Sequence, residues 1–445
     1  MKEQIRLSDH FGYKRLLRFT APAILMMIFT SVYGVVDGFF VSNFVGKTPF
    51  AAVNFIMPFL MVVGAFGFMF GAGGSALIAK TLGEGDRDRA NRIFSFITYI
   101  TVISGVAIAV LGIVFLRPIA AFLGADGNML DDCVIYGRIN LAALPFLMIQ
   151  YAFSALVITA EKPKLGLVVT VASGLTNIIG DALLVALFDG GIVGAAFATA
   201  AGQIIGGIIP LIYFARKNTS LLKLGRFRSD MRALWKICMN GSSELMSNIS
   251  MSVVGMLYNA QLLRYAGENG VAAYGTIMYV NFIFIAAFIG YSMGVAPVVS
   301  FHYGAKNREE LKSLLRKSTV VILLASLGMF GVSLLLSKPL ASIFVGYDPV
   351  LLDMTTHAFS IYAFSFLFAG IAIFGSSFFT ALNDGLTSAL ISFLRTLLFQ
   401  SAAVMLMPLI FGLDGIWYSV VAAEALAVAI TLLFIVGKRY RYGYM

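Results

Sequence analysis

The feature that most constrains this chain is its series of apolar runs, each separated from the next by a short polar stretch. Each run is about 20 residues or longer, which is enough helix to cross the roughly 30 Å of hydrocarbon in a bilayer. Hydrophobic residues fill 59% of the 445 positions and charged residues only 12%, about half of the charged share of ordinary soluble domains. The sequence therefore predicts an all-α polytopic membrane protein.

Twelve membrane-spanning helices are expected. They fall near residues 16–41, 51–79, 93–116, 133–159, 165–187, 191–214, 238–263, 272–300, 318–337, 353–380, 386–410 and 414–437.

The basic residues indicate how these helices are oriented. Of the 32 Lys and Arg, 26 fall in segments on the same side as the N-terminus, and the opposite loops keep about four. Short cytoplasmic loops carry an excess of Lys and Arg, so we expect both termini in the cytoplasm, with the chain in a bacterial-type cytoplasmic membrane. The same bias accounts for the net charge of +10, and no nucleic-acid partner is expected.

The chain repeats itself once. A shift of 221 residues aligns FAAVNFIMP from Phe50 with VAAYGTIMY from Val271, and without a gap it pairs Gly83 with Gly304. Six spans return the chain to its starting side, so the two halves share one orientation and are related by an axis along the membrane normal.

The repeat defines the expected domains. We expect six-helix bundles at 1–215 and 238–445, joined by a basic cytoplasmic linker at 216–237. The LLKLGRF portion of the linker, 221–227, is either a simple connector or a short helix on the membrane surface.

Two acids lie inside apolar spans of the first half. Asp37 follows Tyr33 by four residues, and Asp181 follows Asn177 by four, so each carboxyl has a hydrogen-bonding neighbour on its own helix face. An ionised carboxylate at mid-membrane costs about 2.5–3.5 kcal/mol, and a second carboxylate nearby disfavours the charged form further. Such a pair can load and release a proton. The alternative is a polar contact that only holds helices together.

The second half does not repeat these acids. At the same shift Asp37 corresponds to Tyr258 and Asp181 to Ala402. Its spans carry other polar residues, namely Glu244, Asn259, Arg395, Gln400 and Glu424. Glu244 either binds a cationic substrate or lies in wetter surroundings near its helix start. We expect Arg395 and Glu424 to form a structural ion pair, because an unpaired Arg would repel cations.

Aromatic and methionine side chains are candidates for the wall of a binding cavity. Aromatic faces attract desolvated organic cations, and Met adapts to varied shapes. The candidates are Tyr33, Met57, Met61, Phe153 and Tyr279, together with Asn259. Packing is the alternative for each. Pro22 interrupts the Asp37 span and is either a hinge or a static kink.

Several segments together resemble one transporter family. They are PAILMMIFTSVYGVVDGFFV in the first span, GGSALIAKTLGEGD closing the second, NIIGDALLV with GGIVGAAFATA in the fifth and sixth, and NGSSELMSNIS opening the second half. In this order they are similar to the multidrug and toxic compound extrusion (MATE) family, in its MepA-like bacterial branch. The resemblance implies two bundles facing a central cavity, and alternating-access export of amphipathic organic cations in exchange for H⁺ or Na⁺.

The resemblance also implies a cation site in the first half. In relatives that have this site, a Tyr and an acid of the first helix, an Asn and an Asp of the fifth, and a Thr of the sixth lie together. The matching residues are Tyr33, Asp37, Asn177, Asp181 and Thr199. Oxygens of this kind take a proton or Na⁺, and the sequence does not separate the two. No other cofactor is expected, and the working unit is expected to be a monomer in the bilayer.

The main alternative function is a flippase for a lipid-linked intermediate. Its cavity should be strongly basic to hold pyrophosphate, whereas the first half places acids at mid-membrane. No GxxxxGK(S/T) motif is present, so ATP-driven export is not expected. The three histidines, His10, His302 and His357, form no metal-binding spacing, and we do not expect an enzyme.

Overall fold

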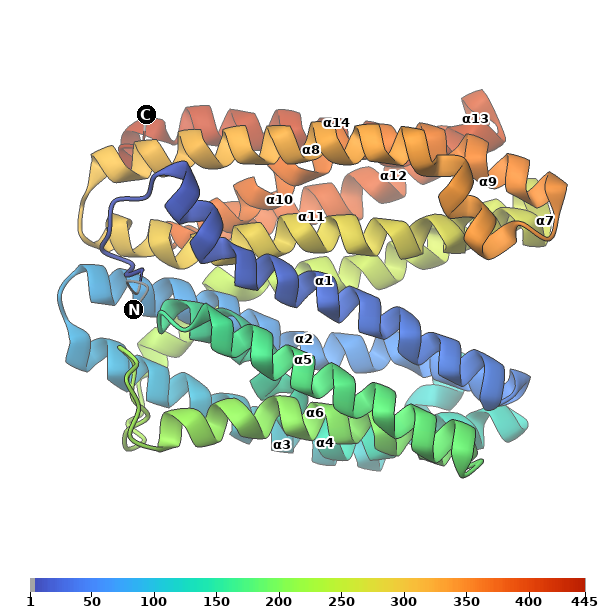
Figure 1. Cartoon of the computed structure of the whole chain (residues 1–445), viewed down its shortest axis with the longest axis horizontal. Helices are drawn as coiled ribbons and strands as arrows, with labels where there is room; N and C mark the ends of the chain where they lie inside the picture. Colours follow the sequence, from blue (N-terminus) through green and yellow to red (C-terminus); the bar gives the residue numbers. More distant parts are fainter. Residues whose placement is uncertain (1–4, 445) are drawn as a thin grey trace.

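The computed structural model describes residues 5–444 and, within that range, every side chain except those of Lys47 and Thr48. Lys2 and the Lys47 side chain, which belong to the charge pattern above, lie outside the described part. Over residues 5–444 the regular secondary structure is helix alone, and the long helices lie side by side (Figure 1). The predicted fold class is confirmed.

The first half forms one bundle. Its elements are α1 (Tyr13–Phe44), α2 (Lys47–Gly83), α3 (Arg87–Leu123), α4 (Gly127–Thr159), α5 (Pro163–Gly180) continued by the π-helical segment η1 (Asp181–Leu187), and α6 (Gly191–Ala215).

The second half forms the other bundle. Its elements are α7 (Met231–Gly304), α8 (Arg308–Val345), α9 (Pro349–Tyr362), the 3₁₀ turn η2 (Ala363–Ser365), α10 (Phe366–Ala381), α11 (Gly385–Phe393), the π-helical η3 (Leu394–Phe399), α12 (Gln400–Leu406), α13 (Pro408–Phe411), α14 (Leu413–Gly437) and α15 (Arg439–Tyr442).

The helix α7 is two spans joined at a glycine. Gly267 has φ +61° and ψ −149°, a backbone conformation that essentially only glycine adopts, and the chain turns back there. Eleven helical segments of the described chain are long and apolar enough to cross a bilayer, and α7, which is one of the eleven, holds two spans. The twelve predicted spans are therefore present.

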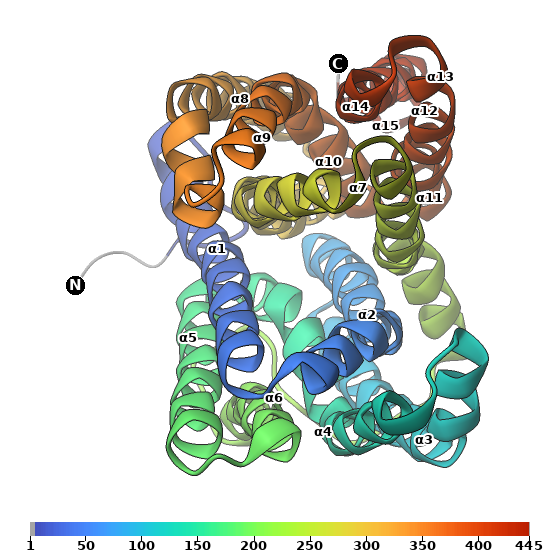
Figure 2. The same cartoon turned by 90° about the vertical axis from the view of Figure 1, so that its right-hand side faces the viewer.

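Two lobes are visible when the molecule is viewed from one end (Figure 2). The helices α1–α6 make one lobe and α7–α14 the other. The linker between them is shorter than predicted, because α7 begins at Met231 and leaves only residues 216–230. These residues form no helix, so the connector interpretation is confirmed and the surface helix is wrong.

The linker is attached to α3 of the first lobe. The Lys223 N–H donates to Asn91 Oδ1 at 2.8 Å, and the Gly225 N–H donates to Ser95 Oγ at 2.8 Å. The Phe227 ring then packs on Phe96 and Tyr99. The linker therefore follows the first lobe over most of its length.

The internal repeat extends to the turns between helices. The side chain of Asp86 accepts from the Arg89 N–H at 2.9 Å and caps the start of α3. The side chain of Asn307, 221 positions later, accepts from the Glu310 N–H at 3.1 Å and caps α8. In each half the capping side chain accepts a hydrogen bond from a backbone N–H that would otherwise have no partner in the helix. The connections before α3 and α8 therefore have the same structure.

The two lobes approach each other most closely along α2 and α7. At four glycines an added methyl group would collide with a backbone carbonyl oxygen of the other lobe. They are Gly73 against Ile237, Gly83 against Phe301, Gly241 against Met69 and Gly304 against Lys80. Gly83 and Gly304 are related by the 221-residue shift, so the axis between the halves passes beside them.

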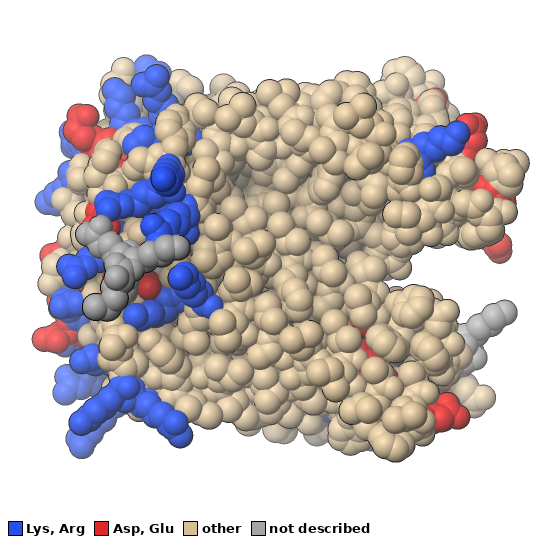
Figure 3. All heavy atoms as spheres, in the orientation of Figure 1, with Lys and Arg blue, Asp and Glu red and all other residues tan. Residues whose placement is uncertain are grey.

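The two ends of the molecule differ in charge and in shape. Lys and Arg side chains gather at the end where both termini lie, which we call the basic end (Figures 1 and 3). At the opposite end the surface is hollowed between the two lobes (Figure 3). The glycine contacts at Gly83 and Gly304 lie at helix ends beside the basic loops. The lobes are thus closed at the basic end and apart at the other.

The C-terminal segment is fixed to the basic end by one carboxylate. Asp384, in the connection between α10 and α11, accepts from Lys438 Nζ at 2.7 Å, from Tyr442 Oη at 2.8 Å and from Thr387 Oγ1 at 2.8 Å. Burial alone would raise the pKa of Asp384, but these three donors outweigh it and hold the pKa below its ordinary value.

Replacing Gly83 by Ala tests the close approach of the lobes. The new methyl group meets the Phe301 carbonyl, which is backbone and cannot rotate away, so we expect a loss of about 1–3 kcal/mol of stability. The measurement is the midpoint of thermal unfolding in detergent. Gly328→Ala is the matched control, because Gly328 is also in a helix and an added methyl group there would meet no atom within 4 Å. Equal midpoints for the two variants would contradict the packing described here.

Candidate functional site

The five residues predicted for a cation site come together inside the first lobe. Asn177 Nδ2 of α5 donates to Asp37 Oδ1 of α1 at 3.1 Å. Asp181, at the start of η1, and Thr199 of α6 also face the Asp37 carboxyl. The Tyr33 ring lies one helical turn before Asp37, within electrostatic reach of it. The helix α1 and the sequence-distant pair α5 and α6 therefore place their polar side chains around one point.

The cluster is buried at Asn177 and Asp181, half-buried at its other residues, and short of hydrogen bonds. Asp181 is 0% exposed, and neither of its carboxyl oxygens has a hydrogen-bond partner among the described residues. The same holds for Asn177 Oδ1 and Thr199 Oγ1. Buried polar atoms are nearly always paired, so a group of unpaired oxygens indicates a site that a ligand completes. Carboxyl, amide and hydroxyl oxygens suit a proton or a hard cation.

Small residues and a change of helix type position the acid. An added methyl group at Gly180 would lie 2.9 Å from the Ala198 side chain, and one at Gly202 would lie 2.9 Å from the Ser173 carbonyl oxygen. The helix α6 therefore lies directly on α5, which brings Thr199 toward Asp181. At Asp181 the helix widens into η1, and π-helical segments of this kind are frequent at functional sites.

Two further residues of the cluster were missed in the sequence. Tyr136 of α4 is 0% exposed, faces Asp37, Asp181 and Thr199, and its hydroxyl has no hydrogen bond among the described residues. Asn140, one turn later, accepts from Gln203 Nε2 of α6 at 3.3 Å. The signal was present, because Tyr136 and Asn140 have the same spacing of four as Tyr33 and Asp37.

The second lobe pairs the polar residues that take the place of the acid cluster. Arg395 Nε donates to both carboxyl oxygens of Glu424, at 3.1 and 2.9 Å, so the predicted ion pair forms. Its Arg lies on the π-helical η3. Tyr258, the counterpart of Asp37, has its hydroxyl within 3.0 Å of Gln400 Oε1 and 2.7 Å of Ser419 Oγ. At these positions the polar groups of the second lobe have partners, whereas the Asp181 carboxyl of the first lobe has none among the described residues.

The residues predicted to line a binding cavity do not form one group. Phe153 is 2% exposed and packs between the rings of Phe94 and Phe214, so its assignment as a cavity residue is wrong. Tyr279 is partly exposed and stacks on Phe344 of α8.

The remaining candidates are open to contact with other molecules. Met61 and Asn259 are exposed, and Met57 is half-buried. Glu244 of α7 is half-buried, and its carboxyl has no hydrogen bond among the described residues. Glu244 is the acid among the predicted lining residues, and no Lys, Arg or His of the described chain forms an ion pair with it.

Comparisons with known proteins agree with this architecture. The family model described as MatE matches residues 22–183 and 245–405, one segment in each lobe. The multidrug export protein MepA of Staphylococcus haemolyticus (strain JCSC1435) is 25% identical over 433 residues, which are 96% of this chain and 94% of that protein.

Solved structures show the same fold. A MATE in complex with MaL6 is similar with a TM-score of 0.93 and 21% identity, covering all of both chains. The outward-facing conformation of a multidrug resistance MATE family transporter of the MOP superfamily gives a TM-score of 0.93 at 20% identity, again over all of both chains.

Replacing Asn177 by Leu tests the polar cluster without any transport. Asp37 loses the amide that donates to it, and removing a partner from this half-buried carboxyl costs at most about 1–3 kcal/mol. We expect a lower midpoint of thermal unfolding in detergent. Asn54→Leu is the matched control, because the Asn54 amide donates to Phe50 of its own helix and Asn54 is exposed. A midpoint for Asn177→Leu that equals the control would contradict the contact.

Proposed function

Because the chain belongs to the MatE family, we propose that it is a secondary antiporter that exports amphipathic organic cations in exchange for H⁺ or Na⁺. The name of its relative MepA, a multidrug export protein, supports the substrate class. The facing acids of the first lobe, Asp37 and Asp181, support the coupling to a cation. We place the working protein in a bacterial cytoplasmic membrane as a monomer.

The observation that carries the proposal is the burial of Asp181 opposite Asp37. Asp181 is 0% exposed and without a hydrogen bond in the described chain, and the described residues give it no cationic partner. A buried carboxylate is tolerated only when it is neutralised or paired. A bound H⁺ or Na⁺ supplies that charge and is held by Asp37, Asn177, Asp181 and Thr199.

The charge pattern supports an orientation in the membrane, and with it a direction of exchange. The positive-inside rule assigns the basic end to the cytoplasm, and both termini lie there. The hollow between the lobes then faces outward, as in the outward-facing relative. In this state the acids take up a cation from outside, and after the lobes rock they release it inside. Each charge moved inward gains about 2.3 kcal/mol per 100 mV of membrane potential.

Substrate binding is assigned to the walls between the lobes. Glu244 attracts the positive charge of the substrate, and Met57, Met61, Asn259 and Tyr279 supply adaptable contacts. The helix α1 is continuous over Tyr13–Phe44, but Pro22 inside it lacks the N–H for one backbone hydrogen bond. This gives the helix that carries Asp37 a point at which it bends.

The second candidate is a flippase for a lipid-linked intermediate. A pyrophosphate-linked substrate needs basic groups in the cavity. Arg395 is the basic residue at mid-membrane in the second lobe, and Glu424 neutralises it. The acids of the first lobe would repel such a substrate, so the antiporter is favoured.

Dye movement in everted vesicles tests the antiporter. Vesicles with wild-type protein or Asp181→Asn are energised by a proton gradient and, separately, by a sodium gradient, and ethidium uptake is followed by fluorescence. We expect the substitution to slow uptake by about tenfold or more, since it removes a chargeable group from the coupling site. The gradient that drives the wild type identifies the ion.

Asp189→Asn is the matched control. It is the same change eight residues later, at an exposed position with positive φ that Asn adopts readily, so uptake should match the wild type. Correctly inserted protein that moves no ethidium under either gradient would refute multidrug extrusion and direct attention to lipid-linked substrates.

A further inference from the structure

The segment before α1 crosses from one lobe to the other at the basic end. Residues 5–12, which we call the N-terminal arm, form no helix and run along both lobes (Figure 1). Leu7 and Phe11 are each 0% exposed, so the arm is seated in the molecule. Burial of two large apolar side chains holds it there, and its backbone must find hydrogen-bond partners.

The first anchor of the arm is a glutamate of the first lobe. The Leu7 N–H donates to Glu161 Oε1 at 2.7 Å. Glu161 lies in the connection between α4 and α5, is 8% exposed and has φ +58°. A backbone donor that meets a nearly buried carboxylate makes a strong, charge-assisted hydrogen bond.

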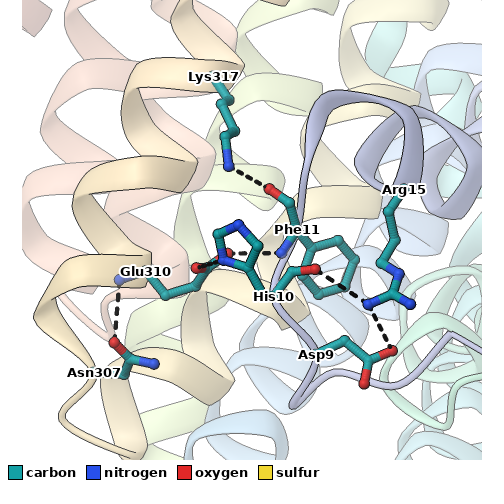
Figure 4. A network of polar contacts seen from close by, with 7 residues as sticks. All are labelled: Asp9, His10, Phe11, Arg15, Asn307, Glu310 and Lys317. Carbon is teal, nitrogen blue, oxygen red and sulfur yellow. Dashed lines mark hydrogen bonds and ion pairs between the residues drawn. The ribbon is translucent and has the colours of Figure 1, made fainter.

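The second anchor is a glutamate of the second lobe (Figure 4). Glu310 Oε1 of α8 accepts from the Phe11 N–H at 2.9 Å, and Glu310 Oε2 lies 2.6 Å from His10 Nδ1. Lys317 Nζ, two turns along α8, donates to the Phe11 carbonyl oxygen at 2.6 Å. One residue of the arm, Phe11, is therefore held at both of its backbone groups by charged side chains of α8.

The sequence around Glu310 shows that this contact replaces a local one. Asn307 and Glu310 have the spacing of a capping box, in which the Glu would fold back to the Asn307 N–H. Here the Asn307 N–H donates to the His302 carbonyl oxygen at 3.0 Å, and the Glu310 carboxylate is left for the arm. The equivalent position in the first lobe is Arg89, which is exposed. Only the second lobe offers this anchor.

A polar cavity of about 420 Å³ lies beside the second anchor. It is lined by residues that include Ser8, His10, His302, Glu309 and Glu310. His302 is 3% exposed, and neither ring nitrogen has a hydrogen bond in the described chain. Water in such a cavity can take over the hydrogen bonds of Glu310 when the arm leaves, which makes the contact reversible.

We propose that the N-terminal arm is a latch, which fastens the two lobes at the basic end through Glu161 and Glu310 and must leave one of them before that end opens. Its place in a transport cycle rests on the proposed function. The latch itself is a property of the closed basic end and needs neither substrate nor gradient. Opening that end increases the distance between α8 and the connection between α4 and α5. An arm bonded to both Glu161 and Glu310 cannot follow this increase without losing one of the two contacts.

The distance between the lobes at the basic end tests the latch. Spin labels are placed at Asp88 of α3 and Arg316 of α8, both exposed, in protein whose Cys133 and Cys238 are replaced by Ala. Pulsed electron resonance in nanodiscs then reports the fraction of molecules with an open basic end, without drug or ion gradient. For Glu310→Ala we expect the open-to-closed ratio to rise by about tenfold or more, because hydrogen bonds to a charged group are lost.

Two further variants separate the latch from misfolding. His10→Ala changes an exposed side chain, leaves the fold intact, and should raise the same ratio by a smaller factor. Glu309→Ala is the matched control. It is the same change one position earlier, where the Glu is exposed and has no hydrogen bond in the described chain, and the ratio should stay at the wild-type value.

The outcomes are decisive in each direction. Unchanged distances in Glu310→Ala, or equal changes in Glu310→Ala and Glu309→Ala, would overturn the latch. Failure of dye transport with a shifted distance distribution would refute the antiporter and leave the latch in place, so the two proposals fail independently.

Discussion

The close contact between α2 and α7 is the interaction on which the rest of the molecule depends. At Gly73, Gly83, Gly241 and Gly304 the two lobes meet with no side chain between the helix and a carbonyl of its partner. Such proximity is possible only for glycine, and it concentrates dispersion contacts where lipid offers no hydrophobic driving force. Because the lobes are held at one end, they can separate at the other, and the hollow of Figure 3 is the result.

A duplicated scaffold here carries unequal chemistry. Each lobe has a π-helical segment in its fifth crossing, η1 or η3, and each segment holds an ionisable residue. In the first lobe this residue is Asp181, which faces another acid and, within the described part of the chain, no base. In the second it is Arg395, which is neutralised by Glu424. The π-helical backbone places an ionisable side chain at the same position in both lobes. The type of that residue decides whether its charge is neutralised within the lobe or requires a bound cation.

The sequence predicted the spans, the repeat and the first-lobe cluster because these follow from strong, local rules. A bilayer demands long apolar helices, and an acid inside one is costly enough to stand out. Side chains with no such cost were harder to place. Phe153 is one of 39 Phe, and only packing against Phe94 and Phe214 shows that it faces inward. Tyr136 has only the weak signal of its spacing to Asn140, and its three-dimensional neighbours place it in the cluster. An apolar pattern at Leu7 and Phe11 predicts an amphipathic arm, but its contact with Glu310 could not be predicted because that acceptor is 299 residues from Phe11.

The attachment of the linker limits how the second lobe can move. Phe227 is packed on α3, and Asp230 already caps α7 by accepting from the Ala233 N–H at 2.9 Å. Only three backbone steps separate Phe227 from Asp230, a span of about 10 Å at full extension. A connection this short keeps the start of α7 within about 10 Å of α3. The second lobe can therefore rotate about this point, but it cannot slide along the first lobe.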